Sequence, residues 1–190
     1  MVKLTIDGIQ VEAEKGTSIL HAAESVGIEV PTLCYIKDLL PDGSCRMCMV
    51  EIENRGRTKM ETACTAQVAE GLVVTTNSEK VRNARRNILD MLLSNHKTDC
   101  FSCPSNGDCK LQELCFEYGI ERTTYSGEQT ELPIDDSNKF FTYNPNLCIL
   151  CHRCVNTCHK IVGRGAIDTM ERGFDSTIGT PFHIDWADTN

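Results

Sequence analysis

Alternating apolar and polar residues open the chain and predict two short β-strands. The alternation covers residues 2–6 and starts again over residues 9–13. Asp7 and Gly8 stand between the two runs, and this pair is typical of a two-residue hairpin turn. The first 14 residues therefore predict a β-hairpin.

A helix and further strands are predicted after the hairpin. Thr17 or Ser18 can cap a short helix, whose apolar side holds Ile19, Leu20, Ala23 and Val26. Strand-like stretches follow at residues 49–53, 59–62 and 72–76, with a turn at residues 54–56 between the first two. This order predicts a small α+β grasp domain that ends near Asn77.

A longer amphipathic helix is predicted to begin after Ser78, with Glu79 favourably placed in its first turn. Its predicted core contacts are Val81, Ile88, Met91 and Leu92. The basic residues Arg82, Arg85 and Arg86 are expected on the solvated face, and a docking patch is the less favoured interpretation.

The remaining chain alternates cysteine-rich and polar segments. A cysteine cluster follows the long helix, a polar connector occupies residues 122–147, and a third cysteine group precedes a glycine-rich tail. We therefore predict three domains, covering residues 1–77, 78–121 and 122–190.

The composition indicates that apolar burial alone does not hold this fold. Hydrophobic residues make up 41% of the chain, but aromatic residues only 6%, and the chain has 12 cysteines. No apolar run reaches the roughly 20 residues of a membrane span, and no secretion signal is expected. Clustered cysteines then favour metal binding in the reducing cytoplasm. A net charge of −8 disfavours nucleic-acid binding.

The first cysteine set has the spacing C-x10-C-x2-C-x15-C and lies inside the predicted grasp domain. It consists of Cys34, Cys45, Cys48 and Cys64. This layout is typical of a [2Fe–2S] ferredoxin, although its first gap is longer than in the plant type. Gly43 would let the backbone approach a cluster. Structural zinc is the minor interpretation, because zinc sites usually use two close pairs.

The second set has the spacing H-x3-C-x2-C-x5-C at the end of the long helix. It consists of His96, Cys100, Cys103 and Cys109. Tetrahedral zinc could use this set, but the neighbouring motifs favour a [4Fe–4S] cluster with one imidazole ligand. A neutral imidazole would make that cluster less negative and raise its reduction potential, unless hydrogen bonding or burial reverses the effect. The remaining Cys115 is expected to be a buried structural thiol.

The third set, in "LCILCHRCVNTCHK", has the spacing C-x2-C-x2-C-x3-C and is the most specific metal signal of the chain. It consists of Cys148, Cys151, Cys154 and Cys158. The first three residues predict a loop around a [4Fe–4S] cluster. His152 and His159 are expected to be exposed rather than to act as ligands.

These motifs, in this order, resemble the N-terminal iron–sulfur region of iron-only hydrogenases. The resemblance rests on the first cysteine set, on "HKTDCFSCPSNGDCKLQ" and on "CILCHRCVNTC". The chain is similar also to the large iron–sulfur subunit of respiratory complex I and to the small diaphorase subunit of NAD-linked hydrogenases. The stretch "GRGAIDTMERGFDSTIGTPF" resembles the hydrogenase and electron-bifurcating transhydrogenase branch.

The resemblance implies a fold and a function. It implies a [2Fe–2S] ferredoxin-like domain, a helical [4Fe–4S] domain with one histidine and three cysteine ligands, and a partial bacterial-ferredoxin-like [4Fe–4S] segment. It also implies an electron-transfer subunit without a catalytic centre of its own. Its expected partners are a flavin-containing, NAD(P)H-oxidising subunit and other redox subunits, with ferredoxin as a further candidate. No G-x-G-x-x-G fingerprint follows a strand, so the nicotinamide site is expected on another subunit.

Two other function classes compete with this interpretation. The chain could be the N-terminal part of a catalytic hydrogenase, which further cysteines in a longer reading frame would establish. It could also be a zinc-binding scaffold, which would be colourless and free of acid-labile sulfide. The sequence leaves open the donor, the acceptor, the direction of electron flow and the choice between NADH and NADPH.

Cys158 raises a separate question, because in two-cluster ferredoxins the fourth cysteine of such a run binds the other cluster. No cysteine follows Cys158. If the chain is complete, Cys158 is the best fourth ligand of the third cluster, although a partner's cysteine is an alternative. One [2Fe–2S] and two [4Fe–4S] clusters then predict about ten irons per chain, and a second ferredoxin motif would raise this to about fourteen.

Overall fold

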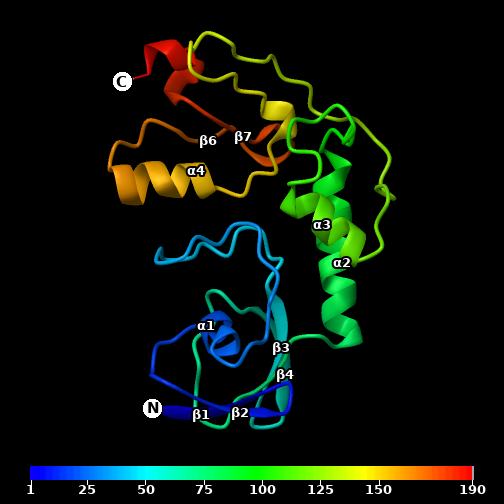
Figure 1. Cartoon of the computed structure of the whole chain (residues 1–190), viewed down its shortest axis with the longest axis vertical. Helices are drawn as coiled ribbons and strands as arrows, with labels where there is room; N and C mark the ends of the chain where they lie inside the picture. The colour runs from blue at the N-terminus through cyan, green and yellow to red at the C-terminus, as the bar shows by residue number, and fades with distance from the viewer. Residues whose placement is uncertain (190) are drawn as a thin grey trace. The chain divides into compact units, whose positions relative to one another are not determined.

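The computed structural model describes residues 1–189, which divide into two compact units (Figure 1). The first unit combines Met1–Asp90 with Ser105–Glu121. The second combines Met91–Pro104 with the chain from Arg122 onward. The three domain boundaries predicted from the sequence stay a prediction.

A five-stranded mixed sheet forms the framework of the first unit. Its strands are β1 (Val2–Ile6), β2 (Ile9–Ala13), β3 (Met49–Asn54), β4 (Arg57–Thr62) and β5 (Val73–Thr75), in the order β2-β1-β5-β3-β4. β1 and β5 are parallel, and the other neighbours are antiparallel. Asp7 and Gly8 form the predicted hairpin turn, with φ angles of 45° and 83°. The predicted order of hairpin, helix and strands is confirmed.

Helix α1 (Ile19–Glu24) covers this sheet and closes its core (Figure 1). Ser18 caps the helix, since its Oγ accepts a hydrogen bond from the His21 N–H at 3.3 Å. The helix buries Ile19, Leu20, Ala22 and Ala23 in a cluster with apolar side chains of the strands. Cys48 and Cys64 belong to the same cluster. The sheet core therefore extends directly to two candidate metal ligands.

Helix α2 (Glu79–Ser94) begins after Ser78, as predicted, but it buries different residues. The Ser78 Oγ accepts from the Val81 N–H at 3.2 Å. The buried positions are Val81, Arg85, Leu89 and Leu93, which recur every four residues. The predicted stripe was wrong in part, because Met91 is 53% exposed. The error arose because Arg85 was treated as a surface residue, which hid the four-residue repeat.

Arg85 lies in the first unit and joins α2 to its neighbours. It is only 3% exposed, so its expected position on the solvated face was wrong, whereas Arg82 and Arg86 are exposed. Its guanidinium donates to the Tyr118 hydroxyl at 2.9 Å and to the Met49 carbonyl at 2.8 Å. Arginine suits this place because its planar group carries several donors in fixed directions.

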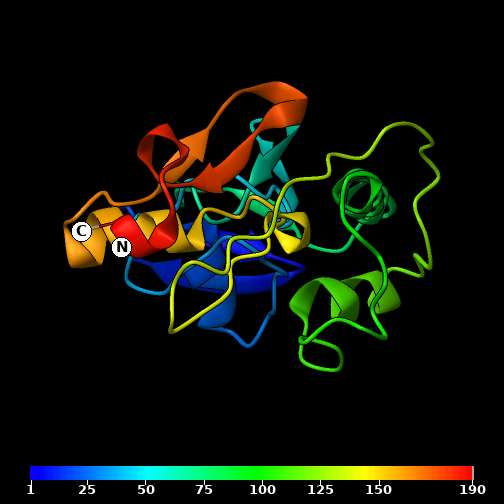
Figure 2. The same ribbon diagram turned by 90° about the horizontal axis from the view of Figure 1, so that it is seen from above.

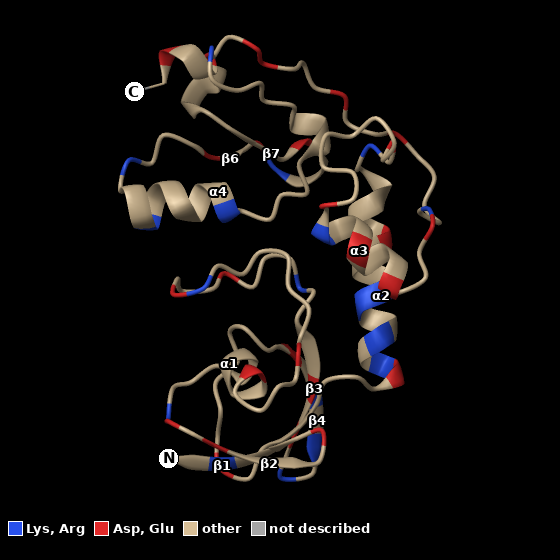
Figure 3. Ribbon diagram, viewed as in Figure 1, with Lys and Arg blue, Asp and Glu red and all other residues tan. Residues whose placement is uncertain are grey.

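Tyr118 directly follows α3 (Lys110–Glu117) and holds this helix beside α2 (Figure 2). Its carbonyl also accepts a hydrogen bond from Arg86. Basic residues gather on the first turns of α2, and α3 carries acidic ones (Figure 3). Cys115 is buried on α3, as expected. Residues 105–121, which include α3 and Cys109, belong to the first unit.

The second unit has little regular structure and little apolar core. It contains α4 (Arg153–Asn156), a π-helical turn (Thr157–Val162) and a hairpin of β6 (Asp168–Met170) and β7 (Thr177–Gly179). Short 3-10 turns lie at Pro145–Leu147, Gly173–Asp175, Pro181–His183 and Trp186–Asp188. Among its described residues, only Leu93 and Ile178 are buried hydrophobics.

Polar and aromatic contacts hold the polar connector in this unit. Tyr143 donates from its hydroxyl to the Ile178 carbonyl at 2.5 Å. Its ring lies 4.9 Å from that of Trp186, centroid to centroid. Asp135 pairs with Tyr143 in an antiparallel bridge. The connector is thus extended, as predicted, and packs on the β6–β7 hairpin, which the sequence analysis missed.

Within residues 1–189, no helix combines the length and the apolar character that crossing a bilayer requires.

Candidate metal centres

The four cysteines of the first set lie in two pairs within the first unit. The Sγ atoms of Cys48 and Cys64 are 3.3 Å apart, and both side chains are buried. Cys34 and Cys45 form the other pair, joined by a hydrogen bond between their side chains. Two pairs of thiols are the arrangement that a binuclear centre needs, because each iron takes two protein ligands.

Within each pair, the side-chain hydrogen bond lowers the pKa of one thiol and raises the pKa of the other. The hydrogen bond with Cys45 lowers the pKa of the Cys34 thiol, and the hydrogen bond with Cys64 likewise lowers the pKa of Cys48. The same hydrogen bonds, followed by burial, raise the pKa values of Cys45 and Cys64. Without metal, Cys34 and Cys48 are therefore the more easily deprotonated thiols of the two pairs. The thiolate is the form that binds metal.

Gly43 lets two cysteine-bearing loops approach each other. Its φ angle is +67°, a conformation that side chains disfavour, and a Cβ atom here would lie 3.2 Å from Cγ2 of Thr65. Thr65 follows Cys64, and its hydroxyl lies 2.5 Å from that of Thr62. Gly43 therefore lies against the turn after Cys64, while the approach of its backbone to a cluster stays a prediction.

His96 follows α2 and is the histidine of the second set. Burial lowers the pKa of its imidazole, which favours the neutral form that can bind metal. Its Nδ1 atom is buried and has no hydrogen-bond partner among the described residues. Buried polar atoms normally have a partner, so this ring fits a site completed by a group beyond the protein.

The structure places three members of the second set in one unit. His96, Cys100 and Cys103 lie in the second unit, and the Cys103 N–H donates to the Cys100 carbonyl at 3.2 Å. Cys109 lies in the first unit, at the N-terminal end of α3. Its place beside the other three stays a prediction.

The third set surrounds a tight loop in the second unit. Leu150 and His152 have φ angles of 53° and 59°, which turn the backbone inward. The Leu150 N–H donates to the Cys148 sulfur at 3.4 Å. Burial raises the pKa values of Cys148 and Cys154, and the neighbouring thiols of the set raise them further. The sulfurs are thus close enough to interact electrostatically.

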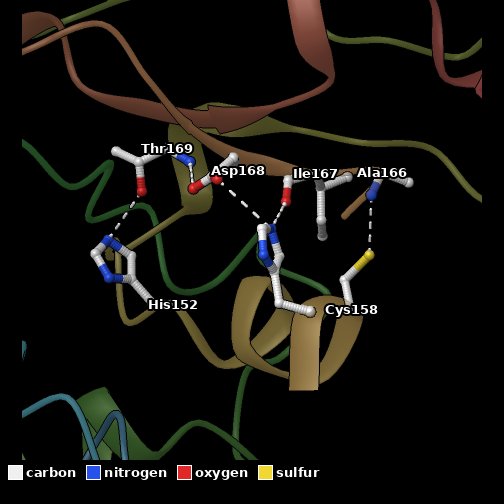
Figure 4. A network of polar contacts seen from close by, with 7 residues as sticks. His152, Cys158, Ala166, Ile167, Asp168 and Thr169 are labelled. Atoms are coloured by element: carbon white, nitrogen blue, oxygen red, sulfur yellow. Dashed lines mark hydrogen bonds and ion pairs between the residues drawn. The ribbon is translucent and has the colours of Figure 1, made fainter. Parts of the chain in front are cut away.

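Cys158 lies on the π-helical turn and is oriented by the segment that leads into β6 (Figure 4). The Ala166 N–H donates to its sulfur at 3.2 Å. His159 is exposed, as expected, and its Nε2 lies 3.0 Å from the Ile167 carbonyl. His152 is half-buried rather than exposed, with its Nε2 at 3.3 Å from the Thr169 hydroxyl. The sequence analysis did not predict the hydrogen bond from Ala166 to Cys158, because backbone donors leave no motif.

Among residues 1–189, no three side chains of histidine, cysteine, aspartate or glutamate converge closely enough to hold a single metal ion. An iron–sulfur cluster distributes its protein ligands over several irons, one or two to each, so it does not require three of them around one point.

Two protein families match parts of the chain. Residues 1–79 match a 2Fe-2S iron-sulfur cluster binding domain. Residues 85–124 match the NADH-ubiquinone oxidoreductase-G iron-sulfur binding region. The iron–sulfur character inferred from the cysteine spacing is confirmed for these two segments, while the individual ligands stay predictions.

Whole-chain comparisons find related redox proteins. The chain is 41% identical over 180 residues to a subunit of an NADH-quinone oxidoreductase of Rhizobium meliloti, covering 94% of this chain and 21% of the relative. It is 40% identical over 191 residues to NADPH-Fe(3+) oxidoreductase subunit alpha of Geobacter sulfurreducens, covering 98% and 22%. The chain thus spans about a fifth of the length of these relatives.

A solved structure resembles nearly the whole chain. It is a chain of an NAD+-reducing [NiFe]-hydrogenase in the H2-reduced state, 30% identical to this one. The TM-score is 0.90, and the match covers 99% of this chain and 79% of that chain.

The contact at Gly43 generates a testable prediction. In Gly43→Ala the new methyl group should push the turn at Thr65 away and lower the occupancy of the [2Fe–2S] cluster at least about twofold. The measurement is iron content and visible absorption after reconstitution. Gly56→Ala is the matched control, because Gly56 also has a positive φ (+75°) but no atom within 4 Å of its added Cβ. Equal occupancy in the two variants would contradict the prediction.

Proposed function

This chain belongs to the family of iron–sulfur subunits of NAD(P)-linked oxidoreductases and hydrogenases, and we propose that it passes single electrons between a flavin-containing, NAD(P)H-oxidising subunit and a second redox partner. The observation that carries this proposal is the pairing of Cys34 with Cys45 and of Cys48 with Cys64 inside a 2Fe-2S domain. The clusters, when bound, accept and release electrons singly. The role of the chain is to hold them, to tune their potentials and to exclude water.

The proposed ligands are the 12 residues of the three sets. The first set would hold a [2Fe–2S] cluster and the second a [4Fe–4S] cluster with one histidine ligand. The third set would hold another [4Fe–4S] cluster. The ligands are Cys34, Cys45, Cys48, Cys64, His96, Cys100, Cys103, Cys109, Cys148, Cys151, Cys154 and Cys158.

We also propose a cellular compartment and redox partners for this chain. Twelve cysteines without a disulfide among the described residues suit the reducing cytoplasm. A complex with several subunits would supply the flavin, and ferredoxin is a candidate acceptor. Electron bifurcation is a narrower form of the proposed function. It rests only on the resemblance of residues 163–182 to the hydrogenase and electron-bifurcating transhydrogenase branch.

Electron transfer can be tested on the reconstituted full chain without oxygen. We expect dithionite to bleach its visible absorption, whereas NADH or NADPH alone should not. Addition of the flavin-containing subunit of the native complex should make one of the two nucleotides effective. Direct bleaching by a nucleotide, or stoichiometric flavin binding by the pure chain, would contradict the proposal.

His96 can be tested by two substitutions with different outcomes. His96→Cys should retain a [4Fe–4S] cluster at a lower reduction potential, because a thiolate adds negative charge, whereas His96→Ala should lose most of it. The measurements are iron content and an EPR-monitored redox titration. His183→Ala, at an exposed histidine of the same unit, is the control. Wild-type potentials and iron content in both His96 variants would rule out this ligand.

Cys158 should serve the third cluster only. Cys158→Ser is expected to lower the iron content from about ten toward about six atoms per chain, while the spectra of the other two clusters stay intact. Cys115→Ser is the control, since Cys115 lies outside the three sets. A full, unperturbed set of clusters in Cys158→Ser would show that another residue or subunit supplies the bond.

A further inference from the structure

Two asparagine side chains form hydrogen bonds with the same short stretch of the connector in the second unit. The stretch is residues 130–132, here named the strap. Asn95 immediately precedes the candidate ligand His96, and Asn146 lies two residues before the candidate ligand Cys148. Neither asparagine belongs to a metal-binding motif.

Asn95 holds one end of the strap with both atoms of its amide. Its Oδ1 accepts from the Thr130 N–H at 2.8 Å, and its Nδ2 donates to the Thr130 hydroxyl at 3.2 Å. A third bond runs from Gln129 Nε2 to the Ser94 carbonyl at 3.3 Å. The segment that joins α2 to His96 is thus fastened to the strap and to the residue before it by side chains on both sides.

Asn146 holds the other end in the same two-point manner. Its Oδ1 accepts from the Leu132 N–H at 2.8 Å, and its Nδ2 donates to the Leu132 carbonyl at 2.9 Å. Asn144 supports this amide, because its Oδ1 accepts from the same Nδ2 at 3.0 Å. The loop that leads into Cys148 is therefore bound to the strap through backbone groups of a single residue.

The strap is short enough to act as a fixed spacer. Thr130 and Leu132 are two residues apart, which limits their separation to about 7 Å even in a fully extended chain. The Thr130 hydroxyl also donates to the Phe174 carbonyl at 3.3 Å, which ties the strap to the turn between β6 and β7. The two ligand-bearing loops are thus joined by side-chain contacts as well as by the chain.

A cavity lies between the same two loops. It has a volume of about 470 Å³, and its walls include Asp99 and Cys103 from one loop and Asn144 and Leu147 from the other. The loops therefore face each other across a space that is not filled by side chains. None of the residues that line this cavity is a buried hydrophobic residue, so apolar packing around the cavity does not fix the distance between the loops.

We propose that Asn95 and Asn146 are positioning residues that hold the loops bearing His96 and Cys148 at a fixed separation through the strap. They thereby set the coupling between the second and third clusters. The inference rests on the ligands proposed above. It matters for function because the rate of electron tunnelling falls steeply with distance.

The test compares magnetic coupling between the two [4Fe–4S] clusters in the reconstituted, dithionite-reduced full chain. In the wild type we expect EPR signals of both reduced clusters, split or broadened by their interaction. Asn95→Ala and Asn146→Ala should retain both signals and the iron content but lose most of the splitting. Asn87→Ala, at an exposed asparagine on α2, should leave the splitting unchanged.

The outcomes separate this inference from the proposed function. Absence of either [4Fe–4S] signal in the wild type would overturn the ligand assignment itself. Both signals without a mutual interaction, or a wild-type splitting in both asparagine variants, would overturn the positioning role alone. If the alanine variants fail to take up iron, Thr130→Val tests the positioning role in their place. It removes the hydroxyl contacts and keeps the N–H bond to Asn95, so it should narrow the splitting, and an unchanged splitting would overturn the inference.

Discussion

The second unit must be held together with almost no buried apolar surface. Only Leu93 and Ile178 are buried hydrophobics among its described residues, whereas the first unit has a continuous core between α1 and its sheet. Ordering one residue costs about 1–2 kcal/mol of backbone entropy, and a typical hydrogen bond returns only about 0.5–1.5 kcal/mol. Side-chain contacts alone therefore cannot order this unit. Metal binding that is coupled to folding can supply the difference.

This constraint gives the polar contacts of the second unit a different role from those of the first. In the first unit, Arg85 and Asp7 connect elements that apolar packing already holds; Asp7, for example, accepts from the Thr76 N–H at 2.7 Å. In the second unit, the amides of Asn95 and Asn146 bind the strap, and by our proposal they fix where the loops with the candidate ligands lie. Their net energies are modest, but they select one arrangement among many that the ligands alone would permit.

The sequence predicted the first unit well and the second unit poorly, for one physical reason. The residues of the sheet and of α1 follow the period-two and helical patterns that burial imposes, so their order could be derived. The pattern failed at Arg85, where a buried guanidinium is satisfied by the Tyr118 hydroxyl, a partner 33 positions away. The β6–β7 hairpin has only three residues in each strand, too few for a recognisable alternation. The cysteine sets were recognised from spacing, whereas the contacts of the strap depend on tertiary structure alone.

The reduction potentials of the clusters also depend partly on features that the sequence shows and partly on tertiary structure. His96 is a neutral candidate ligand in a place where a cysteine thiolate would carry a negative charge. Its effect on the charge of the cluster can therefore be inferred from the sequence. The donors to the sulfurs of Cys148 and Cys158 are the backbone N–H groups of Leu150 and Ala166. Hydrogen bonds to cluster sulfurs help to set the reduction potential, and a backbone donor depends on loop conformation rather than on residue type. The left-handed conformation of Leu150 and the contacts of His159 with the segment before β6 hold these donors in place. The loops proposed to bind the third cluster would therefore also set its reduction potential through their backbone conformation.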